Sequence, residues 1–253
     1  MFLLICVALR AQNARPSAEA SVFSANVRTG STIRYRNSQW KVVKQIRATF
    51  DVGAGPANVV LLRSSEPTGT SGAGHPMNDV GLLILQGGRV VYDYARNRVD
   101  GPGFSGSPFL MDDYLEIRDL SHDGTPQILF HSGYRGASDS VTFEHILLYN
   151  KSKTSFADVA IEPFYNSGTH GLQWLTLEAR TLVVIADRNW PPTVPLEYQC
   201  HYCGSPFKYD AYQWNNKTGA FEPYARLRGE KSYSEAGLAL KGDWALIQSG
   251  FSR

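Results

Sequence analysis

The sequence lacks a strong excess of charge of either sign, and it lacks a long uninterrupted apolar run. Its 25 Lys and Arg residues nearly balance its 23 Asp and Glu residues, so the formal net charge is only +2. A charge this small gives no reason to expect nucleic acid or a membrane surface as a partner. No segment has the about 20 apolar residues that a membrane-spanning helix needs, so we expect no transmembrane segment.

Acidic residues are missing between Ala20 and Phe50, where the basic residues are Arg28, Arg34, Arg36, Lys41, Lys44 and Arg47. One interpretation is an anion-binding face. The other is the solvated side of edge strands, where Lys and Arg discourage edge-to-edge pairing. No Arg/Gly-rich or aromatic nucleic-acid motif accompanies these residues, which favours the edge strands.

Cysteine is scarce, with three residues in the whole chain. Cys200 and Cys203 form a lone C-x-x-C, and a zinc site would need two further ligands. Haem attachment would need His where Gly204 stands, and a redox pair would be expected at the start of a helix in an α/β chain. We therefore predict a local disulfide between Cys200 and Cys203, with zinc binding and redox activity as alternatives.

The N-terminus has the order of features found in a signal peptide. A short apolar run over residues 2–9 precedes Ala18-Glu19-Ala20, which fits the small-residue pattern of a cleavage site. No Lys or Arg precedes the apolar run, and a buried N-terminal strand is the alternative. We expect residues 1–20 to be a signal peptide and residues 21–253 to form one extracytoplasmic domain, periplasmic or secreted.

Tyr, Phe, Trp, Gly and Pro are abundant, and this mixture favours strands and turns. Residues 40–50 alternate with a period of two. Trp40, Val42, Ile46, Ala48 and Phe50 are expected on one face, and Lys44 is an exception on that face. Gly87-Gly88 separates two apolar runs and predicts a hairpin.

Three units, at about residues 33–95, 113–160 and 170–228, share one plan of a strand, a connection, an apolar strand and a hairpin. We predict an all-β fold of repeated four-stranded antiparallel sheets, propeller-like, with a β-sandwich as the alternative. A fourth unit would have to come from residues 21–39 and 229–253. Near the C-terminus we expect a short helix capped by Ser234 and ended by Gly242, then a strand over residues 244–247.

The best-preserved unit contains an acidic loop, Asp119-Leu120-Ser121-His122-Asp123-Gly124, between two strands. A hard cation such as calcium needs several oxygen ligands held by a tight turn. Candidate ligands are Asp119, Ser121, Asp123, the Thr125 carbonyl and Gln127. The alternative is an Asp-Gly turn in which Asp119 and Ser121 bond to backbone amides.

Residues 119–129, DLSHDGTPQIL, resemble the FG-GAP/VCBS repeats of integrin-alpha-like β-propellers, and residues 51–61 resemble them in degenerate form. The resemblance covers about half of the chain, with one well-matched loop. The resemblance implies a propeller-like fold and one calcium site. Gln127 stands where the family often has an acid.

Residues 103–108, GFSGSP, resemble the nucleophile motif of chymotrypsin-like serine proteases, with Ser105 as the nucleophile. That family places a His and an Asp upstream of the Ser. Here His75 is the upstream His, without the expected surroundings, and Asp79 and Asp93 are the candidate acids. A Gly/Ser/Pro loop between two β units is the alternative.

Aromatic residues cluster around the cysteine pair: Tyr198, Tyr202, Phe207, Tyr209, Tyr212, Trp214, Phe221 and Tyr224. They would suit a carbohydrate- or peptide-binding platform, or core and cross-strand packing. The leading hypothesis is an exported non-catalytic binding or structural protein, stabilised by one calcium ion, with a protein or glycan partner. The alternatives are a secreted serine hydrolase using Ser105 and a carbohydrate-binding module.

Overall fold

Three apolar runs dictate the layout of the chain. Residues 59–62, 128–130 and 182–186 are buried at every position, as expected for strands covered on both faces. The computed structural model describes residues 27–51, 55–94, 109–135, 140–159, 165–178, 180–190 and 203–252. In it each run lies in an inner strand of an antiparallel sheet, with a paired strand on either side.

Sheet 1 has the strand order β1-β2-β3-β6-β7 and is antiparallel throughout. Its strands are β1 (Thr32–Tyr35), β2 (Ser38–Ala48), β3 (Ala57–Ser64), β6 (Val80–Gln86) and β7 (Arg89–Asp93). A small ribbon of β4 (Gly69–Thr70) and β5 (Pro76–Met77) lies in the β3–β6 connection. Gly87 and Gly88 join β6 to β7 with φ of 56° and 79°, which is why glycine suits this two-residue turn.

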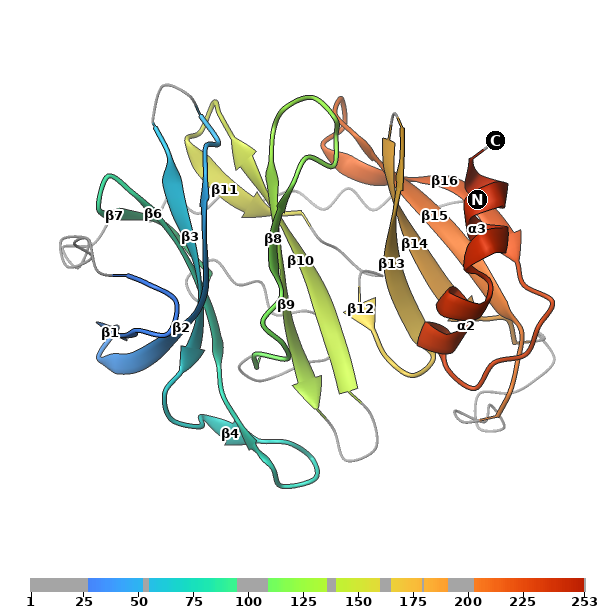
Figure 1. Ribbon diagram of the computed structural model, residues 1–253, viewed down its shortest axis with the longest axis horizontal. Coiled ribbons are helices and arrows are strands. Elements are labelled where there is room, and N and C mark those ends of the chain that lie inside the picture. Colours follow the sequence, from blue (N-terminus) through green and yellow to red (C-terminus); the bar gives the residue numbers. More distant parts are fainter. Residues whose placement is uncertain are drawn as a thin grey trace, which may run out of the picture.

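Sheet 2 has the order β11-β10-β9-β8, and sheet 3 has the order β13-β14-β15-β16. The strands of sheet 2 are β8 (Leu115–Arg118), β9 (Gln127–Arg135), β10 (Ser140–Asn150) and β11 (Ser155–Asp158). The strands of sheet 3 are β13 (His170–Leu177), β14 (Arg180–Arg188), β15 (Phe207–Asn215) and β16 (Ala220–Arg228). A short strand, β12 (Tyr165–Asn166), pairs with β10 and lies between sheets 2 and 3 (Figure 1).

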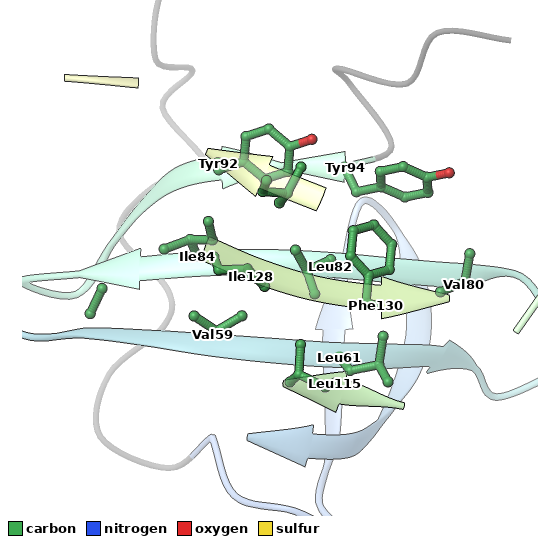
Figure 2. Packing of buried hydrophobic residues seen from close by; sticks show 12 residues of the cluster. Val59, Leu61, Val80, Leu82, Ile84, Tyr92, Tyr94, Leu115, Ile128 and Phe130 are labelled. Carbon is green, nitrogen blue, oxygen red and sulfur yellow. The ribbon is translucent and has the colours of Figure 1, made fainter. Parts of the chain in front are cut away.

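The three sheets stand face to face in a row (Figure 1). Figure 2 shows the core between sheets 1 and 2, where Val59, Leu61 and Ile84 of sheet 1 meet Ile128 and Phe130 of sheet 2. A second core, around Leu129, Val183 and Ile185, joins sheets 2 and 3. Sheet 2 is therefore buried on both faces.

Both outer faces of the row are covered. On sheet 1, Tyr35 and Val42 share a core with Val60 and Leu62, and the Tyr35 hydroxyl donates to Asp93 at the end of β7. On sheet 3, the helices α2 (Ala236–Gly242) and α3 (Trp244–Phe251) pack against β14 and β15. The prediction of an all-β fold with repeated antiparallel sheets and a short C-terminal helix is confirmed.

The described residues of 27–39 and 229–252 do not form a fourth unit, because β1 belongs to sheet 1 and residues 236–251 are helical apart from Asp243. The strand expected over residues 244–247 is the start of α3. Ile247 and Phe251 are both 0% exposed, and their spacing of four is helical. Glu235, not Ser234, is the N-cap of α2, although α2 ends at Gly242 as expected.

The face assignment of β2 also needs correction. A β-bulge between Val42 and Lys44 shifts the register against β3, so Val42 pairs with Leu62 but Lys44 pairs with Leu61. Trp40 and Val42 consequently pack on the outer face of sheet 1. After the bulge, Ile46 and Phe50 pack toward sheet 2, with Val43. The bulge explains why Lys44 interrupted the simple alternation.

Within the described residues, neither helix has the length and apolar character needed to cross a membrane.

Candidate functional site

The acidic loop between β8 and β9 is closed by its own hydrogen bonds. The carboxylate of Asp119 accepts the backbone N–H of Gly124 at 2.7 Å and that of Asp123 at 3.3 Å. The Ser121 hydroxyl lies 3.2 Å from Asp119 Oδ1 and 2.8 Å from Asp123 Oδ1. Gly124 has φ of +85°, which favours glycine there. Oxygens of three alternate residues therefore converge.

The other two predicted ligands are engaged inside the same loop. The side-chain amide of Gln127 donates to the Thr125 carbonyl at 2.6 Å, and its Oε1 accepts the Leu120 N–H at 2.7 Å. Burial acts to raise the pKa of Asp123, but hydrogen bonds from Ser121 and Thr125 outweigh it and lower that pKa. The loop keeps this carboxyl ionised.

The oxygen atoms of this loop meet part of the coordination that a cation requires. The Asp119, Ser121 and Asp123 oxygens are of the type that calcium prefers. Among the described residues, no group of three or more His, Cys, Asp or Glu side chains is arranged to hold a metal ion. If an ion binds, backbone and hydroxyl oxygens must supply much of its coordination.

The tip of the loop contacts the neighbouring sheet. His122 has φ of 55°, and its Nε2 lies 3.1 Å from the hydroxyl of Thr181 at the start of β14. Thr181 is only 2% exposed. The loop thus connects sheet 2 to sheet 3, a role that sequence reasoning did not foresee.

Sheet 2 also carries a Ser–His–Asp chain that the sequence analysis missed. Ser132 Oγ lies 2.6 Å from His145 Nε2, and His145 Nδ1 lies 2.6 Å from Asp158 Oδ2. Because a carboxylate only accepts, Nδ1 carries the proton and Nε2 is left to accept from Ser132. This is the connectivity of a nucleophile, a general base and an orienting acid.

The burial of this chain limits what it can do. Ser132 is 1% exposed, and its side chain faces the core between sheets 1 and 2. The Tyr94 hydroxyl lies 3.2 Å from His145 Nε2 and 3.5 Å from Ser132 Oγ. The His145 ring stacks on Phe130 at 4.5 Å between centroids, and Figure 2 shows Tyr94 beside Phe130. The Ser132 hydroxyl is thus enclosed by Tyr94 and the His145 ring within the described residues.

The opposite face of sheet 2 carries a second histidine cluster. His131 Nδ1 lies 2.8 Å from Asp112 Oδ2, and its Nε2 lies 2.8 Å from Glu144 Oε2. The Tyr114 ring stacks on the imidazole at 4.2 Å. Burial acts to lower the pKa of His131, but the hydrogen bonds to Asp112 and Glu144 outweigh it and raise that pKa to about 9. His131 is therefore an imidazolium at neutral pH.

Sheet 3 also has a histidine bound to a carboxylate on the neighbouring strand. His170 and Asp187 are hydrogen-bonded cross-strand partners. Lys208 lies 3.6 Å from the same carboxylate. Burial acts to raise the pKa of Asp187, but the His170 hydrogen bond and the neighbouring charges lower it overall. His131 with Glu144 and His170 with Asp187 occupy paired positions in hairpin registers.

Several predicted site residues lie outside the described part of the chain. These are the signal peptide over residues 1–20, Ser105 and Cys200, and with Cys200 the predicted disulfide. Cys203 is described, and its carbonyl accepts Arg188 Nη1 at 2.9 Å. Of the upstream residues considered with Ser105, Asp93 is instead hydrogen-bonded to Tyr35 and paired with Arg36 at 2.8 Å.

Aromatic residues of the predicted platform pack inside the protein. Phe207 and Tyr209 lie in the core between sheet 3 and the helices, whereas Trp214 and Phe221 lie in the core between sheets 2 and 3. All four are at most 9% exposed. Tyr198 and Tyr202 fall outside the described residues.

Neither a protein-family model nor a curated protein sequence matches this chain. The solved structure of CarG aligns with a TM-score of 0.41 and 8% sequence identity, over 53% of this chain and 94% of CarG. A TM-score of this size carries no argument about fold or function.

Proposed function

We propose that this chain is an exported, non-catalytic binding or structural protein built from FG-GAP-like repeats. Three consecutive antiparallel sheets of four or five strands and the loop from Asp119 to Gln127 support the repeat assignment. The order of apolar run and cleavage pattern in residues 1–20 supports export.

The burial of Ser132 is the observation that carries the non-catalytic part of the proposal. Ser132 has the hydrogen-bond geometry of a nucleophile, yet it is 1% exposed and contributes to the interface between two sheets. Buried polar networks whose members are all hydrogen-bonded rigidify and specify a core. We therefore assign the Ser132–His145–Asp158 chain to sheet packing rather than to acyl transfer.

A fluorophosphonate probe tests this assignment on the folded, full-length protein. We expect no adduct on Ser132 and none on Ser105, by mass spectrometry of the digested protein. Ser132→Ala and Ser105→Ala variants serve as controls for the site of any labelling. An adduct on either serine that is lost in the matching variant would replace this proposal with a serine hydrolase.

We further propose that one calcium ion stabilises the acidic loop. Asp119, Ser121, Asp123 and the Thr125 carbonyl would hold it, with Gln127 beside them. The ion would supply positive charge between the two carboxylates. The expected effect is modest, because the loop is already closed by backbone hydrogen bonds to Asp119 and Asp123.

Export has its own test. We expect the protein recovered from the periplasm or medium of expressing cells to begin just after Ala20, by N-terminal sequencing. Recovery of the protein with residues 1–20 intact, inside the cell, would refute the signal-peptide assignment.

A further inference from the structure

Two polar rows lie on the facing surfaces of sheets 2 and 3. In sheet 2, Tyr114 stacks on His131, and His131 is the cross-strand partner of Glu144. In sheet 3, His170 is the cross-strand partner of Asp187. His131 lies two residues after Leu129, and Asp187 lies two residues after Ile185. Leu129 and Ile185 belong to the apolar core between these sheets, so each polar row lies on the same sheet face as that core.

Both rows lie at the same end of the interface. The contact of His122 with Thr181 marks the opposite end, and β9 and β14 both run away from it toward the rows. The strand β12 pairs with Thr142 and Phe143, next to Glu144, and leads into β13 at His170 (Figure 1). The interface is therefore apolar in its middle and ionisable at the β12 end.

Glu144 has an unused acceptor at this polar end. Its side chain is 3% exposed, and its Oε2 accepts from His131. Its Oε1 is buried and has no hydrogen-bond partner among the described residues. A buried carboxylate oxygen without a donor is costly, so this atom marks a place where a donor is missing.

The charges around Glu144 select the kind of donor. The imidazolium of His131 lies between the carboxylates of Asp112 and Glu144, which leaves this cluster one negative charge in excess. Both ring nitrogens of His131 donate, so it has no lone pair for a metal ion. A hard metal ion needs several oxygens, whereas an N–H donor with a positive charge needs one.

We propose that the β12 end of the interface between sheets 2 and 3 binds a primary ammonium group through Glu144 Oε1. The proposal rests on the binding role given above and names the class of ligand. Because Glu144 is 3% exposed, the occupant is a small amine or the tip of an unbranched chain such as a lysine side chain. His131 holds the Glu144 carboxylate in place from the other side.

Methylammonium chloride is the probe, and the His131 imidazole C–H resonances in NMR spectra of the full-length protein are the readout. A His131→Gln variant assigns these resonances. We expect a saturable shift with methylammonium and at least about tenfold weaker binding of tetramethylammonium, which has the same charge but no N–H donor. This comparison needs only the wild-type protein.

Glu144→Gln should weaken methylammonium binding at least about tenfold, because the charged acceptor is lost. Glu222→Gln is the control, since Glu222 is an exposed carboxylate on sheet 3 that is already hydrogen-bonded to Asn215 at 2.9 Å. It should leave binding unchanged. Equal responses to the two cations, or no saturable shift with methylammonium, would overturn the amine site and indicate that water satisfies Glu144. Either result leaves the non-catalytic assignment intact, because the fluorophosphonate experiment tests it separately.

Discussion

The imidazole of His122, at the tip of the acidic loop, lies 3.1 Å from the buried hydroxyl of Thr181 on the adjacent sheet. His122 comes from the loop that follows β8, whereas Thr181 starts the apolar run of β14. The loop that most resembles a cation site thus also joins two repeats. Its residues can be retained for this contact whether or not an ion binds.

Removing this contact should cost stability. We expect His122→Asn to lower the free energy of unfolding by about 1 kcal/mol, because Thr181 would keep a buried hydroxyl without its partner. Asn tolerates the left-handed conformation at φ of 55°, so backbone strain does not add to the effect. In a chain of this size the melting temperature should fall by about 2–4 °C.

A double-mutant cycle with Thr181→Val checks the assignment. If His122 and Thr181 interact as described, His122→Asn should have little effect in the Thr181→Val background. Additive losses would show that His122 acts elsewhere.

Calcium should raise the melting temperature of the wild-type protein, and a chelator should reverse the increase. Asp119→Asn should abolish this response, because Asp119 supplies a carboxylate to the proposed ion. The same variant should lose about 1 kcal/mol without calcium, since the carboxylate accepts two backbone N–H groups. If millimolar calcium does not change the melting temperature, the proposed calcium site is wrong and the loop is an Asp-Gly turn closed by its own hydrogen bonds.

The His131 cluster predicts an alkaline loss of stability. The pKa of His131 is raised to about 9, above its unfolded value of about 6.5. Its contribution is therefore complete below about pH 6.5 and is lost as the pH rises through about 9, on the order of 3 kcal/mol at most. Urea unfolding from about pH 6 to about pH 10 should show this slope in the wild type and not in His131→Gln.

His75→Gln is the control for that series, because His75 is exposed and should leave the slope unchanged.

At acid pH the dependence of stability on pH has the opposite sign. Burial acts to raise the pKa of Asp112, but the hydrogen bond from His131 lowers it overall. The Asp112 contribution is thus present above its ordinary value of 3.8 and lost as the pH falls through the lowered pKa. An alkaline slope that persists in His131→Gln would contradict the assignment.

The helical cap on sheet 3 should be energetically important. Phe251 is 0% exposed in the core between α3 and sheet 3, so Phe251→Ala should cost about 3–5 kcal/mol. Leu246 lies on the same helix and is 42% exposed, so Leu246→Ala should change stability by less than about 1 kcal/mol. Chemical denaturation of the two variants gives the comparison, and similar losses would mean that the helices do not form a packed cap.

Strands and turns were predictable where local chemistry determines them. The paired glycines at Gly87 and Gly88 lie at an observed hairpin between β6 and β7. The runs at residues 59–62 and 182–186 are continuous rather than alternating, which matches strands covered on both faces.

Features set by tertiary packing were not predictable in the same way. The bulge in β2 moves Ile46 and Phe50 to the face opposite Val42, and one extra residue leaves little trace in the sequence. Residues 244–247 pack as a helix because β14 and β15 offer an apolar face to cover. The Ser132–His145 contact joins adjacent strands whose register depends on the long β9–β10 connection.

The covered outer faces make this row of sheets a one-dimensional system with two closed ends. Each sheet gains its stability from its nearest neighbours, as in other stacked repeat proteins. Losing a terminal cover exposes one apolar face, but losing sheet 2 separates the molecule into two halves. The amides of β9 and β10 should therefore exchange with solvent through the most global opening, while β1 and α3 open locally first.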